Sequence, residues 1–263
     1  MSARVFDFTN AIVRLPGRSV VNGIRKGSLA PTYEGVLAEH TAYVAALREA
    51  GLTVDVLPPL EAYPDSVFVE DPALVLPEGA IVLRPGVDSR IGEADEIRAA
   101  LDVHFDRVLA LEGEEYADGG DVLVAPDEVF IGLSRRTSRK GAEALAGKLA
   151  MLGREARIAE TPADILHFKT ASSLLDERTV MATQAMAASG AFAGLDVIAV
   201  PEGEEGAANF LRVNDTVLVG SHFPRTIALL QARGYTAKAM PVREIAKIDA
   251  GLSCMSLRWR SNR

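Results

Sequence analysis

The only cysteine of the chain, Cys254, stands nine residues before the last residue. Taken alone, a single thiol in an apolar stretch is more often a small buried hydrophobe than a reactive group. A nucleophilic thiol needs a base beside it in the fold and a further group that holds that base. Candidates for these two roles are His167, in the segment LHFK at 166–169, and Asp118, in the segment DGGD at 118–121.

Three acidic residues, Asp65, Glu70 and Asp71, lie within seven positions. A guanidinium is planar, cationic and poorly electrophilic, so attack on its carbon needs carboxylates on its N–H edges and a strong nucleophile. If residues 66–71 form a strand, Glu70 and Asp71 face opposite sides, and both reach one ligand only at a strand end or a twist. A solvated acidic turn and a metal site are the alternative interpretations.

The spacing of possible metal ligands argues against the metal site. The chain has a single cysteine, and no two of its four histidines are three or four positions apart. Pairs of that spacing are typical of zinc sites. We therefore expect no metal in the site. The four histidines are His40, His104, His167 and His222.

Composition bounds the class of protein. The chain has 263 residues, of which 48% are hydrophobic, which is ample for a core. Its 28 basic and 36 acidic residues give a net charge of -8, which argues against nucleic-acid and anionic-membrane partners and is compatible with a cationic small molecule. One cysteine excludes an internal disulfide framework, and no apolar run approaches the roughly 18 residues of a membrane span. We expect a soluble cytoplasmic protein.

A strand, turn, strand pattern recurs along the chain. The apolar alternation predicts a strand at 5–13, a loop at 15–27, a helix from Tyr33 that ends near Gly51, and a strand at 53–57. Four later segments each read as two strands joined by a polar turn: 71–84, 121–133, 173–183 and 209–220.

Helical stretches such as 141–152 and 225–233 follow these hairpins, so the unit repeats every ~40 to 50 residues, as in proteins built from small repeated units. A fifth unit can be assembled if the strand around Cys254 pairs with the strand at 5–13. That pairing would close the repeats into a ring. Because no linker or low-complexity tract interrupts the chain, we expect one domain over residues 1–263.

Six short segments, in one order and at matching spacing, resemble the dimethylarginine dimethylaminohydrolases of the pentein superfamily. Each is weak alone, but the ordered set spans nearly the whole chain. The segments are 65–71 (DSVFVED), 84–90 (RPGVDSR), 118–121 (DGGD), 132–137 (GLSRRT), 166–169 (LHFK) and 251–254 (GLSC). The resemblance implies an α/β fold, a five-bladed pseudo-symmetric propeller of ββαβ-like repeats around a central active site, which agrees with the repeat count.

The resemblance also implies roles for the polar residues. Cys254 would be the nucleophile, His167 the general acid and base, and Asp118 the carboxylate that orients His167, at a position where some family members carry Glu. Taken alone, His167 reads as a core histidine and Asp118 as a turn residue. The implied substrate contacts are the backbone carbonyls of Ile24 and Ile248 and the side chain of Asp65 for the α-amino group, Glu70 and Asp71 for the guanidinium, and Arg90 and Arg136 for the α-carboxylate.

The implied reaction is hydrolysis of N-omega-methylated arginine to citrulline and methylamine or dimethylamine through a covalent intermediate on Cys254, without metal or organic cofactor. A related arginine deiminase or amidinotransferase would use the same residues, although the deiminases are typically longer. A guanidino-compound binding protein on the same fold is a further alternative, but a pure binder needs no nucleophile. Exposed helices on a propeller rim commonly form dimer contacts, so a homodimer is one expectation for the assembly.

Overall fold

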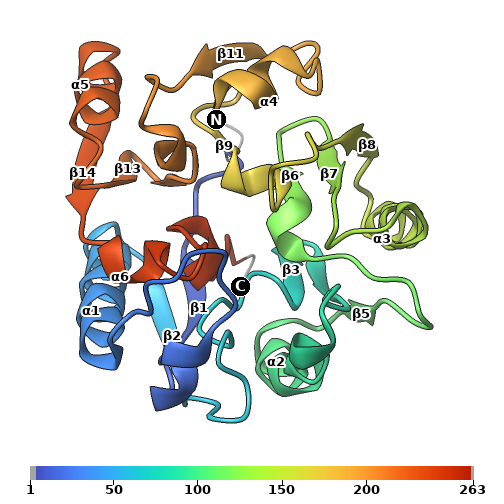
Figure 1. Ribbon diagram of the computed structural model, residues 1–263. Coiled ribbons are helices and arrows are strands. Elements are labelled where there is room, and N and C mark those ends of the chain that lie inside the picture. Colours follow the sequence, from blue (N-terminus) through green and yellow to red (C-terminus); the bar gives the residue numbers. More distant parts are fainter. Residues whose placement is uncertain (1–3, 262–263) are drawn as a thin grey trace.

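Five small sheets surround a central axis in the computed structural model, which describes residues 4–261 (Figure 1). Each sheet has three strands. The first two pair antiparallel, as a hairpin in four sheets and as a pairing of the two chain ends in the fifth. The third strand runs parallel to the second after a helical crossover. The five-bladed α/β propeller expected from the sequence is therefore confirmed, with one ββαβ unit in each blade.

Four units follow one another along the chain. They are β3 (Ala73–Leu76), β4 (Gly79–Val82), α2 (Glu93–His104) and β5 (Val108–Ala110); β6 (Val122–Val124), β7 (Val129–Leu133), α3 (Arg139–Met151) and β8 (Ala156–Glu160); β9 (Ser172–Leu174), β10 (Thr179–Ala182), α4 (Gln184–Ala188) and β11 (Asp196–Ala199); and β12 (Leu211–Val213), β13 (Thr216–Gly220), α5 (Pro224–Ala232) and β14 (Thr236–Met240).

The fifth unit joins the two ends of the chain. It consists of β15 (Leu257–Trp259), β1 (Asn10–Arg14), α1 (Tyr33–Glu49) and β2 (Thr53–Leu57). Strands β1 and β15 pair antiparallel, with Ala11 opposite Arg258, and this pairing closes the ring. The strand predicted around Cys254 begins only at Leu257, because Cys254 lies in the 3-10 turn at Ser253–Met255 that precedes it. The predicted strand at 5–13 begins only at Asn10. Residues 4–8 instead line a cavity of the propeller, and we call the side of the propeller on which this cavity lies its rear side.

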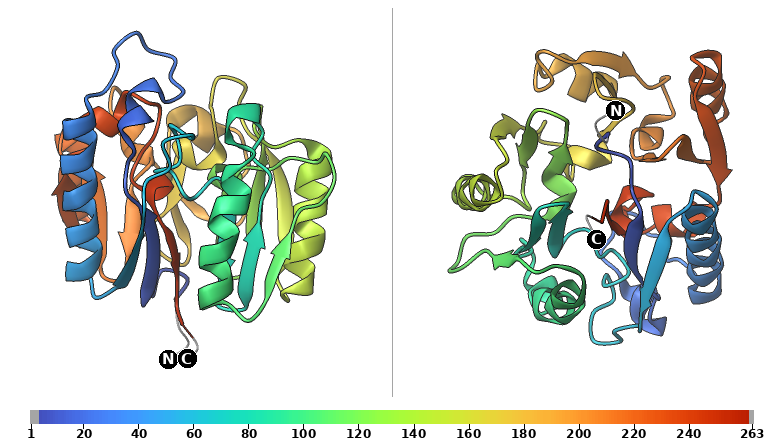
Figure 2. Two further views of the ribbon diagram at one scale, coloured as in Figure 1. Left: turned by 90° about the horizontal axis from the view of Figure 1, so that it is seen from below. Right: turned by 180° about the vertical axis from the view of Figure 1, so that it is seen from behind.

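Helices lie on the outside and the sheets stand edge-on to the axis (Figure 2). Side-chain caps begin three of the helices: Thr32, Ser138 and Thr183 each accept a hydrogen bond from a backbone N–H in the first turn. Gly51, beyond the end of α1, has φ +95°, a left-handed conformation that glycine adopts freely. Among residues 4–261, no helix has the length and apolar character needed to cross a membrane.

Short connectors precede the first strand of each unit. Most contain a 3-10 turn: η3 (Gly119–Asp121), η4 (Phe168–Thr170), η5 (Glu205–Ala208) and η6 (Ser253–Met255). The corresponding segment before β3 is a series of turns that ends in Asp71, so residues 66–71 are not the strand considered in the sequence analysis. The remaining elements are η1 (Arg18–Asn22), η2 (Asp88–Arg90) and α6 (Arg243–Ala246).

Candidate active site

The five connectors meet at the axis. Hydrogen bonds link them into a closed ring, in which four links join connector residues and the fifth comes from Ser173 in β9. Its members, which we call the connector ring, are residues 70–71, 118–121, 167–168, 208–209 and 253–254. The links between neighbouring units are Gly119 N–H to Asp71 O (3.0 Å), Phe168 N–H to Asp121 Oδ1 (2.8 Å), Ser173 Oγ–H to Ala208 O (2.8 Å), Ser253 N–H to Asn209 Oδ1 (3.1 Å) and Glu70 N–H to Cys254 O (3.2 Å). The repeat therefore brings one polar segment per unit to the centre.

His167 and Asp118 contact each other directly. Nε2 of His167 lies 3.0 Å from Oδ2 of Asp118, and the Asp118 side chain is completely buried. Oδ1 of Asp118 accepts the N–H of Gly86 at 2.7 Å, and Oδ2 also accepts from Arg136 at 3.3 Å. The carboxylate of Asp118 is thus held by three partners, one of which is His167.

Buried carboxylates around His167 set the pKa of its imidazole. Burial alone would lower the pKa of His167, but Asp71, the hydrogen bond to Asp118 and the charge of Asp121 together raise it to about 9. Gly120 permits this approach, because a Cβ there would lie 2.9 Å from both His167 Nδ1 and Asp71 Oδ1. The imidazole is therefore a cation at neutral pH.

Asp71 is paired with a buried arginine. Burial would raise the pKa of Asp71, but Arg90 and His167 lower it, so the carboxylate stays charged. Arg90 is 3% exposed, and its Nη1 binds Oδ2 of Asp71 while Nε and Nη2 bind both oxygens of Glu93. Nη2 also donates to the carbonyls of Asp65 and Phe68. The Arg90 guanidinium thus has most of its donors in use, whereas the Arg136 guanidinium has a single acceptor, Asp118, within residues 4–261.

One oxygen each of Asp71 and Asp118 and one ring nitrogen of His167 lie within 4.8 Å of one another, a spacing that geometry alone would allow for a metal ion. Chemistry disfavours it. Arg90 and Arg136 already contact the two carboxylates, and the same carboxylates hold His167 protonated, whereas a ligating histidine must be neutral. We therefore treat the cluster as an acid and base site.

Cys254 lies in the η6 turn and is partly buried. Burial, and then the negative charges of Glu70 and Asp71, raise the pKa of the Cys254 thiol to about 11, against the lowering effect of hydrogen bonds with the Gly251 backbone and the Asn209 side chain. Asn209 Nδ2 lies 3.6 Å from the sulfur. The thiol of the substrate-free protein is therefore neutral at pH 7.

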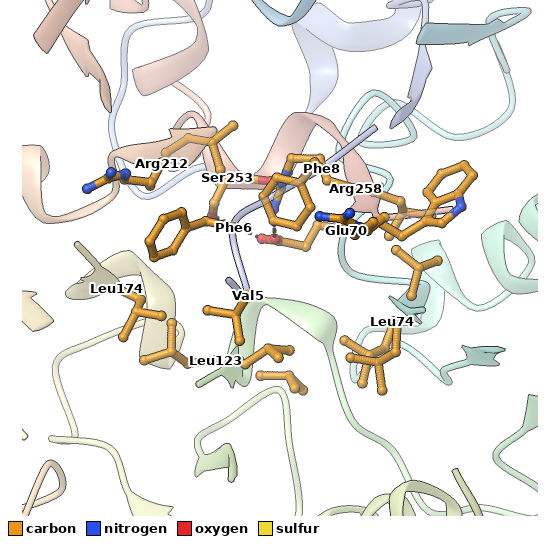
Figure 3. Close-up of a pocket in the computed structure, with 18 of the residues that line it drawn as sticks. Val5, Phe6, Phe8, Glu70, Leu74, Leu123, Leu174, Arg212, Ser253 and Arg258 are labelled. Atoms are coloured by element: carbon orange, nitrogen blue, oxygen red, sulfur yellow. Dashed lines mark hydrogen bonds and ion pairs between the residues drawn. The ribbon is translucent and has the colours of Figure 1, made fainter. Parts of the chain in front are cut away.

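Glu70 faces away from the acid and base site. Its carboxylate binds Lys169 at 2.7 Å, Arg258 at 3.2 Å and the hydroxyl of Ser253 at 3.0 Å. These residues line a cavity of about 620 Å³ on the rear side of the connector ring (Figure 3). Arg258 also donates to the carbonyls of Ser253 and Ser256, on either side of Cys254. We call the η6 turn that holds Cys254 the nucleophile turn. Glu70 therefore holds the nucleophile turn in place through its contacts with Ser253 and Arg258.

The predicted contacts for an α-amino group are neighbours. Ile24 N–H donates to Asp65 Oδ1 at 3.0 Å, and a Cβ at Gly23 would lie 3.1 Å from that oxygen and 3.2 Å from Ile248. Ile24 is 37% exposed, whereas Ile248 is buried. Burial raises the pKa of Asp65. The loop at 15–27 is thus attached to the segment that precedes the ring.

Three residues of the site were assigned no role from the sequence, although one of them, Asp121, lies in the DGGD segment. Glu93 on α2 neutralises Arg90, Asp121 receives the hydroxyls of Ser134 and Thr137, and Asn209 contacts Cys254. The repeat itself offered one clue to Asn209. Four of the five connectors contain a residue that the sequence analysis selected. The fifth connector, before β12, contains Asn209, which was not selected.

The comparisons with known proteins point to one family. A family model described as N,N dimethylarginine dimethylhydrolase, eukaryotic, matches residues 25–202. The N(G),N(G)-dimethylarginine dimethylaminohydrolase of Pseudomonas aeruginosa is 35% identical over 254 residues, which cover 96% of this chain and 100% of the relative. The chain belongs to the dimethylarginine dimethylaminohydrolase family. The Streptomyces coelicolor protein of that name is 31% identical over 85% of this chain and 86% of its own.

Solved structures of the family agree with the fold. The P. aeruginosa enzyme, as a cysteine-to-serine mutant complexed with citrulline, superposes with a TM-score of 0.93 at 34% identity, over 96% of this chain and 100% of that one. The N-terminal domain of the cyanobacterial arginine dihydrolase ArgZ matches with a TM-score of 0.84 at 19% identity, over 96% and 97% of the two chains. At that identity the second match supports the pentein fold alone.

Proposed function

We propose that this chain is a dimethylarginine dimethylaminohydrolase that converts N-omega-methylated arginines to citrulline and dimethylamine or methylamine through a covalent intermediate on Cys254. The observation that carries the proposal is a shared charge: the buried carboxylate of Asp71 raises the pKa of both His167 and Cys254. Carboxylates beside a neutral thiol and a protonated histidine suit a cationic guanidinium substrate.

Substrate binding would activate the nucleophile. The guanidinium places a positive charge beside Asp71 and the sulfur, which offsets the negative charges that keep the thiol protonated. Arg136, assisted by Arg90, would bind the substrate α-carboxylate by charge-assisted hydrogen bonds. The Ile24 and Ile248 carbonyls and Asp65 would hold the α-amino group, and the thiol proton would leave to solvent.

In the first chemical step, the Cys254 thiolate forms an S–C bond with the guanidinium carbon. His167, bound to Asp118 through Nε2, would donate a proton from Nδ1 to the departing nitrogen. The C–N bond breaks, methylamine or dimethylamine leaves, and a cationic thiouronium remains on the sulfur. Asp71 would keep hold of the nitrogen that stays with the product.

In the second step, neutral His167 takes a proton from a water molecule as that water attacks the thiouronium carbon. The C–S bond then breaks with its electron pair on sulfur, the new C–OH group gives up its proton to the thiolate or to solvent, and citrulline leaves. Protonation of the thiolate restores the resting enzyme. Glu70, which binds Lys169 and Arg258 and not the ring interior, would act by positioning the nucleophile turn.

The proposal treats residues 1–263 as one catalytic domain that acts on a small molecule without nucleic-acid or membrane partners. A reactive thiol must stay reduced, so a cytoplasmic location is the corresponding expectation. Exposed helices on the rim leave a homodimer as the proposed assembly.

Citrulline formation from asymmetric dimethylarginine, monomethylarginine and arginine, measured side by side without added metal, tests the proposal. We expect turnover of the methylated substrates and its loss in Cys254→Ser. Preference for arginine would instead indicate a deiminase. Undiminished activity of Cys254→Ser would exclude the thiol mechanism, and inactivity on all three substrates would exclude the proposed substrate class.

A further inference from the structure

Asn209 is the polar residue that the fourth unit brings to the connector ring. It is 8% exposed, and both ends of its side-chain amide are in use. Oδ1 accepts the backbone N–H of Ser253 at 3.1 Å, and Nδ2 lies 3.6 Å from Cys254 Sγ. The mechanism above gives this residue no role.

We propose that Asn209 is a further catalytic residue, whose amide N–H donates a hydrogen bond to the Cys254 sulfur and stabilises the thiolate as it attacks and again as it leaves. The inference rests on the proposed function for its chemical context. The contact itself does not, because the sulfur and the amide face each other in the substrate-free protein.

The orientation of the amide follows from its second partner. A backbone N–H can only donate, so the oxygen of the amide must face Ser253. The NH₂ group is then the end directed at the sulfur, and the usual ambiguity between the oxygen and nitrogen of an asparagine does not arise.

The surroundings hold Asn209 in this position. A Cβ at Gly251 would lie 2.4 Å from Asn209 Cγ, so the nucleophile turn can approach the amide only with glycine there. From the other side, the Ser173 hydroxyl binds the carbonyls of Ala208 and Phe210, the two neighbours of Asn209 in the chain. The amide is thus placed by both of its neighbouring segments.

A neutral donor suits this site better than a charged one. Lys or Arg at this position would stabilise a permanent thiolate but would also repel the cationic guanidinium. An amide dipole directed at the sulfur stabilises negative charge without adding a net charge. It acts against Glu70 and Asp71, which disfavour the thiolate.

The test compares Asn209→Asp and Asn209→Ala with the wild-type protein. Asn209→Asp keeps the shape but puts an acceptor or a charge at the sulfur. We expect the thiol pKa, read from the pH dependence of iodoacetamide alkylation, to rise, so that alkylation at pH 8 slows about tenfold or more. We expect kcat to fall about 10- to 100-fold, with KM nearly unchanged, because the contact strengthens as charge develops on sulfur.

Asn214→Asp is the matched control. It makes the same substitution in the β12–β13 turn, where φ is 52° and the side chain binds Phe8 N–H and Ala50 O. It should leave the alkylation profile unchanged. An unchanged thiol pKa in Asn209→Asp and Asn209→Ala, with both variants folded by thermal melting, would overturn the proposal. Because alkylation needs no substrate, this outcome is distinguishable from failure of the proposed reaction.

Discussion

The two sides of the connector ring are built differently. On the acid and base side, Asp71, Asp118 and His167 are bound by charged or backbone partners, at 2.7 Å from Gly86 and 3.0 Å between His167 and Asp118. On the nucleophile side, the Cys254 sulfur has neutral and longer contacts, with Asn209 Nδ2 at 3.6 Å, with Ser253 Oγ at 4.0 Å and with the Gly251 backbone. The side of Asp118 and His167 thus has short, charge-assisted hydrogen bonds, whereas the side of Cys254 has longer contacts with neutral groups.

This difference indicates where the protein has fixed its charge in advance. Carboxylates keep His167 protonated, whereas burial together with Glu70 and Asp71 keeps Cys254 protonated. Under the proposed mechanism, His167 is therefore protonated before the substrate binds, whereas ionisation of Cys254 needs the positive charge of the substrate. A guanidinium would reactivate the thiol only when it is bound at Asp71, which limits unwanted reactions of the free thiol.

The largest expected effect comes from removing the acid. His167→Gln leaves no group to protonate the departing amine, so kcat for dimethylarginine should fall by about 10³-fold or more. Citrulline formation under saturating substrate measures this. The matched control is His104→Gln, on the rim, where the histidine contacts Asp55 and not the ring. Comparable losses in the two variants would contradict a specific role for His167.

A second substitution should act on the two sides in opposite directions. In Asp71→Asn the guanidinium loses its carboxylate, so kcat/KM should fall about 10²-fold. The Cys254 thiol loses a neighbouring negative charge, so its alkylation by iodoacetamide should become faster. Asp102→Asn, at a surface pair with Arg98, is the control. Parallel losses in turnover and alkylation would show that the shared-charge account is wrong.

The pH dependence of kcat/KM follows from counting protons. Below about pH 9 the free enzyme holds both a protonated His167 and a Cys254 thiol. Attack requires a thiolate with protonated His167, which is one proton fewer. We expect kcat/KM to rise about tenfold per pH unit until about pH 9 and to fall above about pH 11. A flat profile between pH 6 and 8 would contradict this order of ionisation.

The smallest expected effect on kcat comes from a substitution at Lys169, which pairs with Glu70 and does not contact Asp71, Asp118 or His167 in the contacts described above. Lys169→Met removes one of the two cations on Glu70, while Arg258 and Ser253 remain bound to it. We expect the free energy of unfolding to fall by about 1–3 kcal/mol, with kcat reduced much less than by the substitutions above. Urea denaturation measures the first quantity. A loss of kcat as large as that of His167→Gln would mean that Glu70 takes part in the reaction directly.

Much of the fold follows from local patterns. Alternating apolar residues and polar turns predicted the hairpins of the four consecutive units, and the helix from Tyr33 was predicted by its apolar stripe. Repetition and the position of Cys254 predicted closure through β1 and β15. These features depend on residues close in sequence or on a period, both of which are visible in a single chain.

The parts that escaped prediction depend on three-dimensional neighbours. Glu70 and Asp71 are adjacent in sequence, yet one binds Lys169 on the rear side and the other binds Arg90 within the site. Asn209 belongs to no motif, because its role is defined by a contact with a residue 45 positions away. The raised pKa values of His167 and Cys254 likewise arise from burial and from charges that the ring assembles.

Direct titration of the Cys254 thiolate is the measurement that bears most closely on the central claim. Its absorbance near the ultraviolet thiolate band, with Cys254→Ser as the blank, gives the ionisation state of the substrate-free enzyme. We predict no thiolate signal below about pH 8 and its appearance only in the range from about 9 to 11. A midpoint below pH 7 would contradict the account, because the nucleophile would then be charged before any substrate binds.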